Sequence, residues 1–113
     1  MEVKLFGEKR MLLVKLSGEL DHHSAAKIKE EADSRLCTTN AVNIVFDFSE
    51  LNFMDSSGIG MLMGRYKKVR TLGGKVIAFG VNAQILRIME MSGIDKIIKL
   101  TPTFEKAMRL LDK

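Results

Sequence analysis

The architecture of this chain follows from two neighbouring segments, Val42-Asn-Ile-Val-Phe-Asp-Phe48 and Asp55-Ser-Ser-Gly-Ile-Gly-Met-Leu-Met-Gly64. Residues 42, 44, 46 and 48 are apolar, and this alternation predicts a half-buried strand. Further on, apolar residues recur at helical spacing as far as Gly73-Gly74, which predicts that the helix ends there. The sequence therefore predicts a strand, a short loop and a helix N-terminus. The apolar positions of the helix are Ile59, Leu62, Met63, Tyr66 and Val69.

The start of this helix combines a carboxylate with two hydroxyls. Asp55 and Ser56 are residue types that cap a helix by accepting hydrogen bonds from its first free N–H groups. Because the helix N-terminus carries partial positive charge, the hydroxyls of Ser56 and Ser57 lie where an anion is tolerated. Asp55 either caps the helix or orients the neighbouring hydroxyl, and the sequence leaves both roles open.

The outer face of the same helix carries small residues. Gly60 and Gly64 lie inside the helical pattern, where each glycine costs about 1 kcal/mol relative to alanine. In helical projection, Ser57, Gly60, Met61, Gly64 and Lys68 fall opposite the apolar stripe. A small, flat surface with an exposed methionine predicts a docking face for another protein. The alternative is that the glycines only let a neighbouring element of the same domain approach closely.

The rest of the chain alternates between strand and helix patterns. Strands are expected at residues 2–6 and 11–17, with a turn between them, and at 75–79 and 97–100. One helix begins at Asp21 or Ser24 and is followed by a loop over residues 37–41, another runs from Asn82 to Gly93, and a last one begins with Thr101 as cap and Pro102 at its first position. The order ββαβαβαβα predicts one α/β domain over residues 1–113. Its sheet is expected to be mixed and mostly parallel, with an N-terminal hairpin and with helices on at least one face.

The composition limits the classes of function. The 113 residues are 46% hydrophobic and 28% charged, which is typical of a globular domain with one core. No apolar run is long enough to span a bilayer, so no membrane association is expected. A single cysteine, Cys37, is expected half-buried at a helix end and fits a reducing cytoplasm. The net charge of +4 is mild, and aromatic residues do not interleave with the basic ones, so nucleic-acid binding is not predicted.

The residue pattern argues against an enzyme. The only histidines, His22 and His23, are adjacent, and no glycine precedes Ser56-Ser57 as a hydrolase nucleophile elbow requires. No convergent set of metal ligands and no phosphate-binding loop occurs. A receiver domain phosphorylated on Asp47 is disfavoured, because this chain begins with a hairpin and lacks the acidic pair that holds magnesium. We predict no catalytic residue, cofactor or metal site.

Several motifs together resemble one family. These are Phe53-Met-Asp-Ser-Ser-Gly-Ile-Gly60 with Gly64-Arg-Tyr-Lys67, the upstream Gly18-Glu-Leu-Asp-His-His23, and the later Met91-Ser-Gly93 and Lys96-Ile-Ile98. The chain resembles a STAS domain, and within that family the anti-sigma factor antagonists of spore-forming bacteria. The likeness runs over nearly the whole chain, and the predicted element order is the one for which STAS domains are known.

The resemblance implies a phosphorylation switch. The unphosphorylated protein would bind an anti-sigma factor that is also its serine kinase, and this binding would release a sporulation sigma factor. Phosphorylation of Ser56 would end binding, a serine phosphatase would restore it, and ATP and magnesium would belong to the kinase. A phosphate at Ser56 would add close to two negative charges at a helix N-terminus, where the fold can accommodate them.

The resemblance also assigns roles to residues. Asp21 and His22 match family positions that contact the anti-sigma factor, although His22 and His23 also fit a plain surface pair. We expect a protein that is monomeric when free. The alternatives are a general-stress antagonist of the same family, or a STAS scaffold or regulatory subunit that is not phosphorylated. The expected partner-binding residues are Asp21, His22, Asp55, Ser56, Ser57, Gly58, Gly60, Met61 and Gly64.

Overall fold

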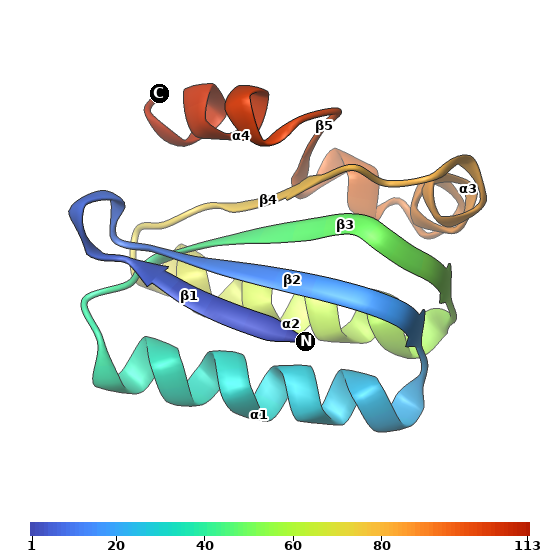
Figure 1. Ribbon diagram of the computed structural model, residues 1–113, viewed down its shortest axis with the longest axis horizontal. Coiled ribbons are helices and arrows are strands. Elements are labelled where there is room, and N and C mark those ends of the chain that lie inside the picture. Colours follow the sequence, from blue (N-terminus) through green and yellow to red (C-terminus); the bar gives the residue numbers. More distant parts are fainter.

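The computed structural model describes residues 1–113 and contains the nine strands and helices in the predicted order (Figure 1). Two short 3-10 turns, η1 (Gly7–Lys9) and η2 (Ile94–Lys96), lie between them. No helix combines the length and the apolar character needed to cross a membrane. The elements are β1 (Glu2–Phe6), β2 (Met11–Leu20), α1 (His22–Thr38), β3 (Asn43–Met54), α2 (Ser56–Thr71), β4 (Val76–Phe79), α3 (Ala83–Ser92), β5 (Lys99–Thr101) and α4 (Phe104–Leu111).

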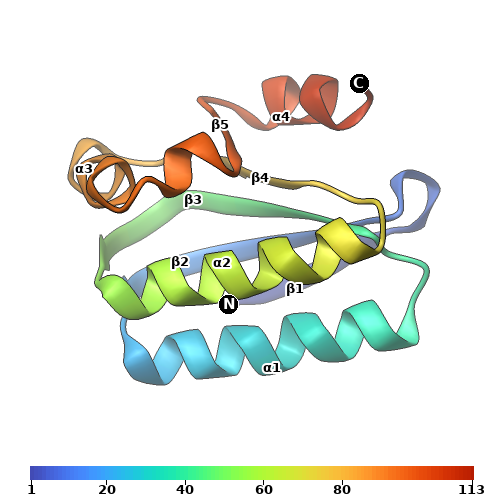
Figure 2. The same ribbon diagram turned by 180° about the vertical axis from the view of Figure 1, so that it is seen from behind.

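The five strands form one sheet whose spatial order is the same as their order in the chain. β1 and β2 form an antiparallel hairpin, and the other neighbours are parallel, which confirms the mixed, mostly parallel sheet. Successive right-handed crossovers that step in one direction leave their helices on the same face of a sheet. Accordingly α1, α2 and α3 share a core on one face, and α4 covers the other (Figures 1 and 2).

Each face of the sheet has its own core. Ile44, Phe46 and Phe48 of β3 are fully buried in the larger core, under α1 to α3, as their alternation predicts. Val45 points the other way, into a smaller core that includes Phe79 of β4 and Ala107 of α4. Helices on both faces explain why the central strands are apolar on both sides.

Strand β3 runs to Met54, so the loop predicted between residue 48 and the helix is wrong. Leu20 pairs with Met54 after two register shifts, and β2 correspondingly continues to residue 20 instead of ending at 17. The segment looks polar because only Leu51 and Met54 of its six residues are buried. Cross-strand pairing therefore outweighs the local polar pattern.

Other boundaries also differ from the prediction, and β5 spans Lys99–Thr101 instead of residues 97–100. The last helix begins at Phe104 with Thr103 as its cap, because Thr101 still pairs with Phe79 in the sheet. Helix α1 continues through Thr38, so Cys37 lies within the helix and is exposed, not half-buried.

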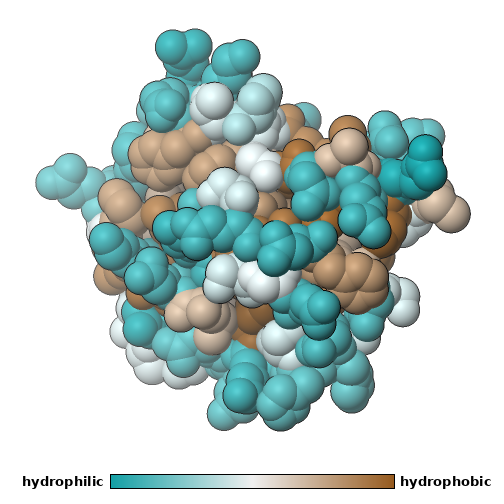
Figure 3. All heavy atoms as spheres, turned by 45° about the vertical axis from the view of Figure 1, so that its right-hand side comes forward, coloured by the Kyte–Doolittle hydropathy of each residue, from teal (hydrophilic) through white to brown (hydrophobic).

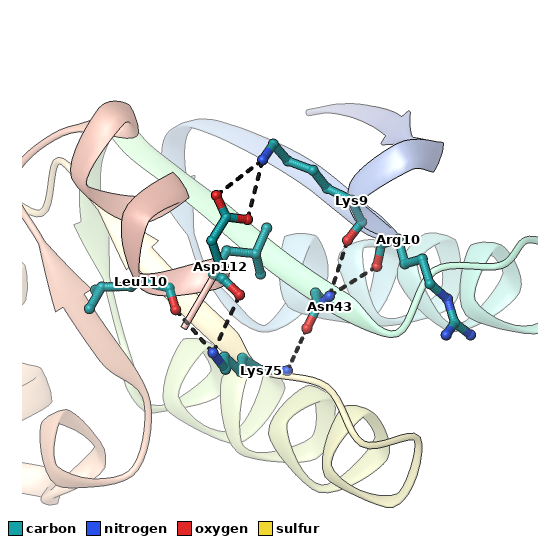
Figure 4. A network of polar contacts seen from close by, with 7 residues as sticks. Lys9, Arg10, Asn43, Lys75, Leu110 and Asp112 are labelled. Atoms are coloured by element: carbon teal, nitrogen blue, oxygen red, sulfur yellow. Dashed lines mark hydrogen bonds and ion pairs between the residues drawn. The ribbon is translucent and has the colours of Figure 1, made fainter.

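A polar network ties together the end of the molecule where the turn of the β1–β2 hairpin meets the C-terminal ends of α2 and α4 (Figure 4). The Asn43 amide donates to the carbonyls of Lys9 and Arg10 at 3.3 and 3.2 Å and accepts from the Lys75 N–H at 2.8 Å. The Lys75 ammonium donates to the Leu110 carbonyl at 3.0 Å, at the end of α4, where free carbonyls attract a cation. This network fixes the end of the fold that is opposite the two motifs described next.

Candidate functional site

The motifs Gly18-Glu-Leu-Asp-His-His23 and Phe53-Met-Asp-Ser-Ser-Gly-Ile-Gly60 meet at one end of the sheet, on the right in Figure 1. β2 and β3 are parallel neighbours, so their carboxyl ends lie side by side, and the Asp55 N–H donates to the Leu20 carbonyl at 3.2 Å. Helices α1 and α2 begin immediately after these strand ends, with Asp21 and Asp55 as their caps. Residues 34 positions apart in the chain therefore form a single surface.

Asp55 caps α2. One of its carboxylate oxygens accepts a hydrogen bond from the Ser57 N–H at 2.8 Å, as predicted for a helix cap. The carboxylate makes no hydrogen bond to the Ser56 hydroxyl, so of its two predicted roles the structure shows capping. Ser56 is the first residue of the helix and is exposed, and its hydroxyl bonds to no other residue.

The three glycines of α2 have different surroundings. A Cβ at Gly58 would overlap the side chains of Met54 and Leu20, so this glycine lets the first turn of α2 lie against the strand ends. A Cβ at Gly60 or Gly64 would meet no atom within 4 Å. Close approach of a neighbouring element therefore explains Gly58 and leaves the bare surface at Gly60 and Gly64 unexplained.

Met61 is buried, at 5% exposure, so its prediction as an exposed docking residue is wrong. Helix α2 packs on α1 as well as on the sheet, which makes its buried arc wider than a single stripe. The buried residues of α2 are Gly58, Met61, Leu62, Arg65 and Val69. The exposed methionine of this end is Met91 of α3, at 81%.

Two hollows flank the start of α2, and Figure 3 shows this end of the molecule with apolar patches set among hydrophilic side chains. The first, which we call the α1–α2 groove, has a volume of about 390 Å³. It is lined by His22, Ala25, Ala26, Lys29, Ser57, Gly60, Met61, Gly64 and Arg65. The second, the Ser56 hollow, measures about 420 Å³ and is lined by Asp55, Ser56, Ile59, Ile88, Met91 and Ser92.

The α1 side of the site is held by a capping box. The Asp21 carboxylate accepts from the Ser24 N–H at 2.9 Å, and the Ser24 hydroxyl accepts from the Asp21 N–H at 2.9 Å. These bonds from Ser24 lower the pKa of the Asp21 carboxyl, because they favour its ionised form. His22 and His23 follow in the first turn, both exposed, and His22 lines the α1–α2 groove.

An ion pair joins the two helices, and the sequence prediction missed it. Arg65 of α2 is only 3% exposed, and its Nε lies 2.9 Å from an oxygen of Asp33 on α1, close enough for an ion pair though not aligned as a hydrogen bond. Lys68 lies 3.3 Å from the other oxygen of the same carboxylate. Burial lowers the pKa of the Arg65 guanidinium, and Asp33 opposes that shift. The available signal was the position of Arg65, four residues from both Met61 and Val69.

The fold and this site define the class of protein. A STAS domain model matches residues 3–107, and the chain therefore belongs to the STAS domain family. This confirms the resemblance drawn from the motifs.

Anti-sigma factor antagonists are among the proteins that this chain resembles in sequence and in fold. The anti-sigma F factor antagonist of Paenibacillus polymyxa is 35% identical over 100 residues, which cover 88% of this chain and 86% of that protein. The anti-sigma factor antagonist SpoIIAA in its unphosphorylated form matches with a TM-score of 0.86 at 24% identity, over 98% of this chain and 95% of that one. The phosphorylated form of the Bacillus cell fate determinant SpoIIAA matches with a TM-score of 0.76, also at 24% identity, over 97% of each chain. At this identity the two structures establish a shared fold.

Proposed function

We propose that this chain is an anti-sigma factor antagonist that acts in the cytoplasm. Its unphosphorylated form binds an anti-sigma factor that is also a serine kinase, and binding releases a sporulation sigma factor. The kinase then phosphorylates Ser56 and ends the interaction, and a serine phosphatase reverses this. The relative from Paenibacillus polymyxa, named for sigma F, supports the sporulation branch over a general-stress antagonist.

The observation that carries this proposal is the position of Ser56. Its hydroxyl is exposed, bonds to no other group, and lies at the first residue of α2, where free N–H groups favour an anion. A phosphate there breaks no existing contact, so the fold is expected to stay intact. The likeness to a phosphorylated Bacillus protein supports this expectation.

The phosphate then acts on the binding of the partner, not on the fold. Ser56 lines the Ser56 hollow and its neighbour Ser57 lines the α1–α2 groove, so a partner that contacts both hollows passes close to the Ser56 hydroxyl. The phosphate adds bulk, close to two negative charges beside Asp55, and tightly held water. Each of these opposes a protein that docks there, which makes the switch a local electrostatic one.

The remaining expected site residues divide by role. Asp21 and His22, at the start of α1, and Ser57, Gly60 and Gly64 form the accessible partner-binding surface. Asp55, Gly58 and Met61 act through the fold, since they cap or pack the helix that carries Ser56. The chemistry of phosphoryl transfer, with ATP and magnesium, belongs to the kinase, and this chain is its substrate.

A direct test is to incubate the protein with ATP, magnesium and its cognate kinase, and to locate the phosphate by mass spectrometry. One phosphate on Ser56 is expected, and none on Ser57. Modification of Ser57 alone would contradict the assignment, and no modification at all would favour a STAS scaffold that is not phosphorylated.

Two variants test the consequence for binding. Ser56→Ala should fold, bind the anti-sigma factor and resist inactivation by ATP. Ser56→Asp should fold but bind at least about tenfold more weakly, because its carboxylate supplies part of the phosphate charge. Calorimetric titration measures both, and binding of Ser56→Asp as tight as that of the wild type would refute the electrostatic mechanism.

A further inference from the structure

The α1–α2 groove carries unbalanced positive charge. Among its nine lining residues, Lys29 and Arg65 carry full positive charge and none carries a carboxylate. Lys29 is exposed on α1 and takes part in none of the five ion pairs of the chain. Its ammonium group is therefore free to pair with an anion that enters the groove.

The ion pair between Arg65 and Asp33, beneath the groove, does not remove this excess of positive charge. Arg65 and Lys68 share the single carboxylate of Asp33, so the cluster of three keeps one net positive charge. The Nη1 group of Arg65 is buried and has no hydrogen-bond partner. Buried polar groups are normally paired, so the cluster has an unsatisfied donor in addition to its net positive charge.

The walls of the groove admit a helix. Gly60 and Gly64 leave open space on the α2 side, one turn apart. On the α1 side two of the four lining residues, Ala25 and Ala26, are also small. A surface of small residues at helical spacing lets another helix backbone approach closely and place one side chain between the two walls.

We propose that the α1–α2 groove receives an aspartate or glutamate side chain from a helix of the anti-sigma factor kinase, and that Lys29 is its ion-pair partner. The proposal rests on the proposed function and adds the chemistry of the partner. Charge complementarity carries it, since the groove offers cations, no carboxylate and room for one incoming side chain. The Ser56 phosphate is not this anion, because Ser56 lines the other hollow.

The test compares charge reversal at two lysines of α1. Lys29→Glu reverses the charge in the groove, whereas the matched control Lys27→Glu makes the same change on the same helix outside it, since Lys27 does not line the groove. Both side chains are exposed, so both variants should fold, and circular dichroism checks this. Affinity for the purified cognate kinase is measured by calorimetry with ADP present, which prevents phosphorylation.

We expect Lys29→Glu to weaken binding by about tenfold or more and Lys27→Glu by less than about threefold. A scan of the kinase should then find one acidic residue whose change to lysine restores binding to Lys29→Glu but not to Lys27→Glu. Equal effects of the two reversals, or rescue by no acidic residue, would overturn the groove proposal while leaving the proposed function standing. Absence of binding by the wild-type protein would instead overturn the proposed function.

Discussion

Gly58 and Gly60 lie within one turn of α2, yet opposite effects are expected when each is replaced by alanine. Gly58→Ala should destabilise the protein by about 1–3 kcal/mol, because the new methyl group overlaps Met54 and Leu20. Gly60→Ala should stabilise it by about 0.5–1 kcal/mol, because the methyl group meets open space and alanine favours the helix. Urea unfolding of both variants measures the difference, and equal losses of stability would show that Gly60 is packed after all.

A second prediction at this scale concerns the Asp21 carboxyl, whose pKa the hydrogen bonds from Ser24 lower. A lowered pKa in the folded state means that the ionised cap stabilises the fold above the ordinary aspartate value, near 4. That contribution is lost as the pH falls through the lowered folded value. Asp21→Asn keeps a good capping side chain that does not titrate.

Comparison of the wild type with Asp21→Asn isolates this group. The free energy of unfolding is measured in urea between pH 7 and pH 2.5. The difference between the two proteins should stay constant above about pH 5 and change below about pH 4 in the direction that disfavours the wild type. A difference independent of pH across the whole range would mean that the capping bonds do not persist in solution.

At the scale of elements, the contact between α1 and α2 depends on the charge pair of Asp33 and Arg65. Asp33→Asn leaves the buried guanidinium without its carboxylate and should cost about 3 kcal/mol of folding stability. The double variant Asp33→Leu with Arg65→Met removes both charges and should recover most of that loss, since an apolar pair needs no desolvation of ions.

The matched control for this prediction is Glu31→Gln, which breaks an exposed ion pair with Arg35 on the same helix. It should cost less than about 0.5 kcal/mol, because exposed pairs contribute little. Similar costs for Asp33→Asn and Glu31→Gln in chemical denaturation would contradict the account of the buried pair.

The elements show where sequence prediction works and where it stops. Helix α2 (Ser56–Thr71) was predicted correctly between its cap, Asp55, and Gly73, because its cap, apolar spacing and terminating glycines are local signals. The extension of β3 to Met54 was not predicted, because pairing with β2 holds that polar segment in the sheet. Met61 and Arg65 were misjudged or missed for one reason. A single stripe describes a helix that packs on one neighbour, whereas α2 packs on the sheet, on α1 and on α3.

At the scale of the whole molecule, the site and the main polar network occupy opposite ends of the sheet (Figures 1 and 4). Asn43 and Lys75 connect the hairpin, the end of α2 and the end of α4, whereas Asp21 and Asp55 cap the helices at the other end. The topology could be predicted from the order of elements, because parallel strands in chain order place successive crossover helices on one face. The meeting of the two motifs follows from the same rule, but the depth and charge of the grooves depend on side-chain packing that no local pattern encodes.

The proposed switch requires that a phosphate on Ser56 abolishes partner binding without altering the fold. The affinity of one preparation of the protein for the cognate anti-sigma factor is measured before and after complete phosphorylation. Amide NMR spectra are recorded on both samples. We predict a loss of affinity of at least about 100-fold, with amide shifts confined to the start of α2 and its neighbours in α1 and α3. Unchanged affinity, or shifts spread through β4, β5 and α4, would contradict the account.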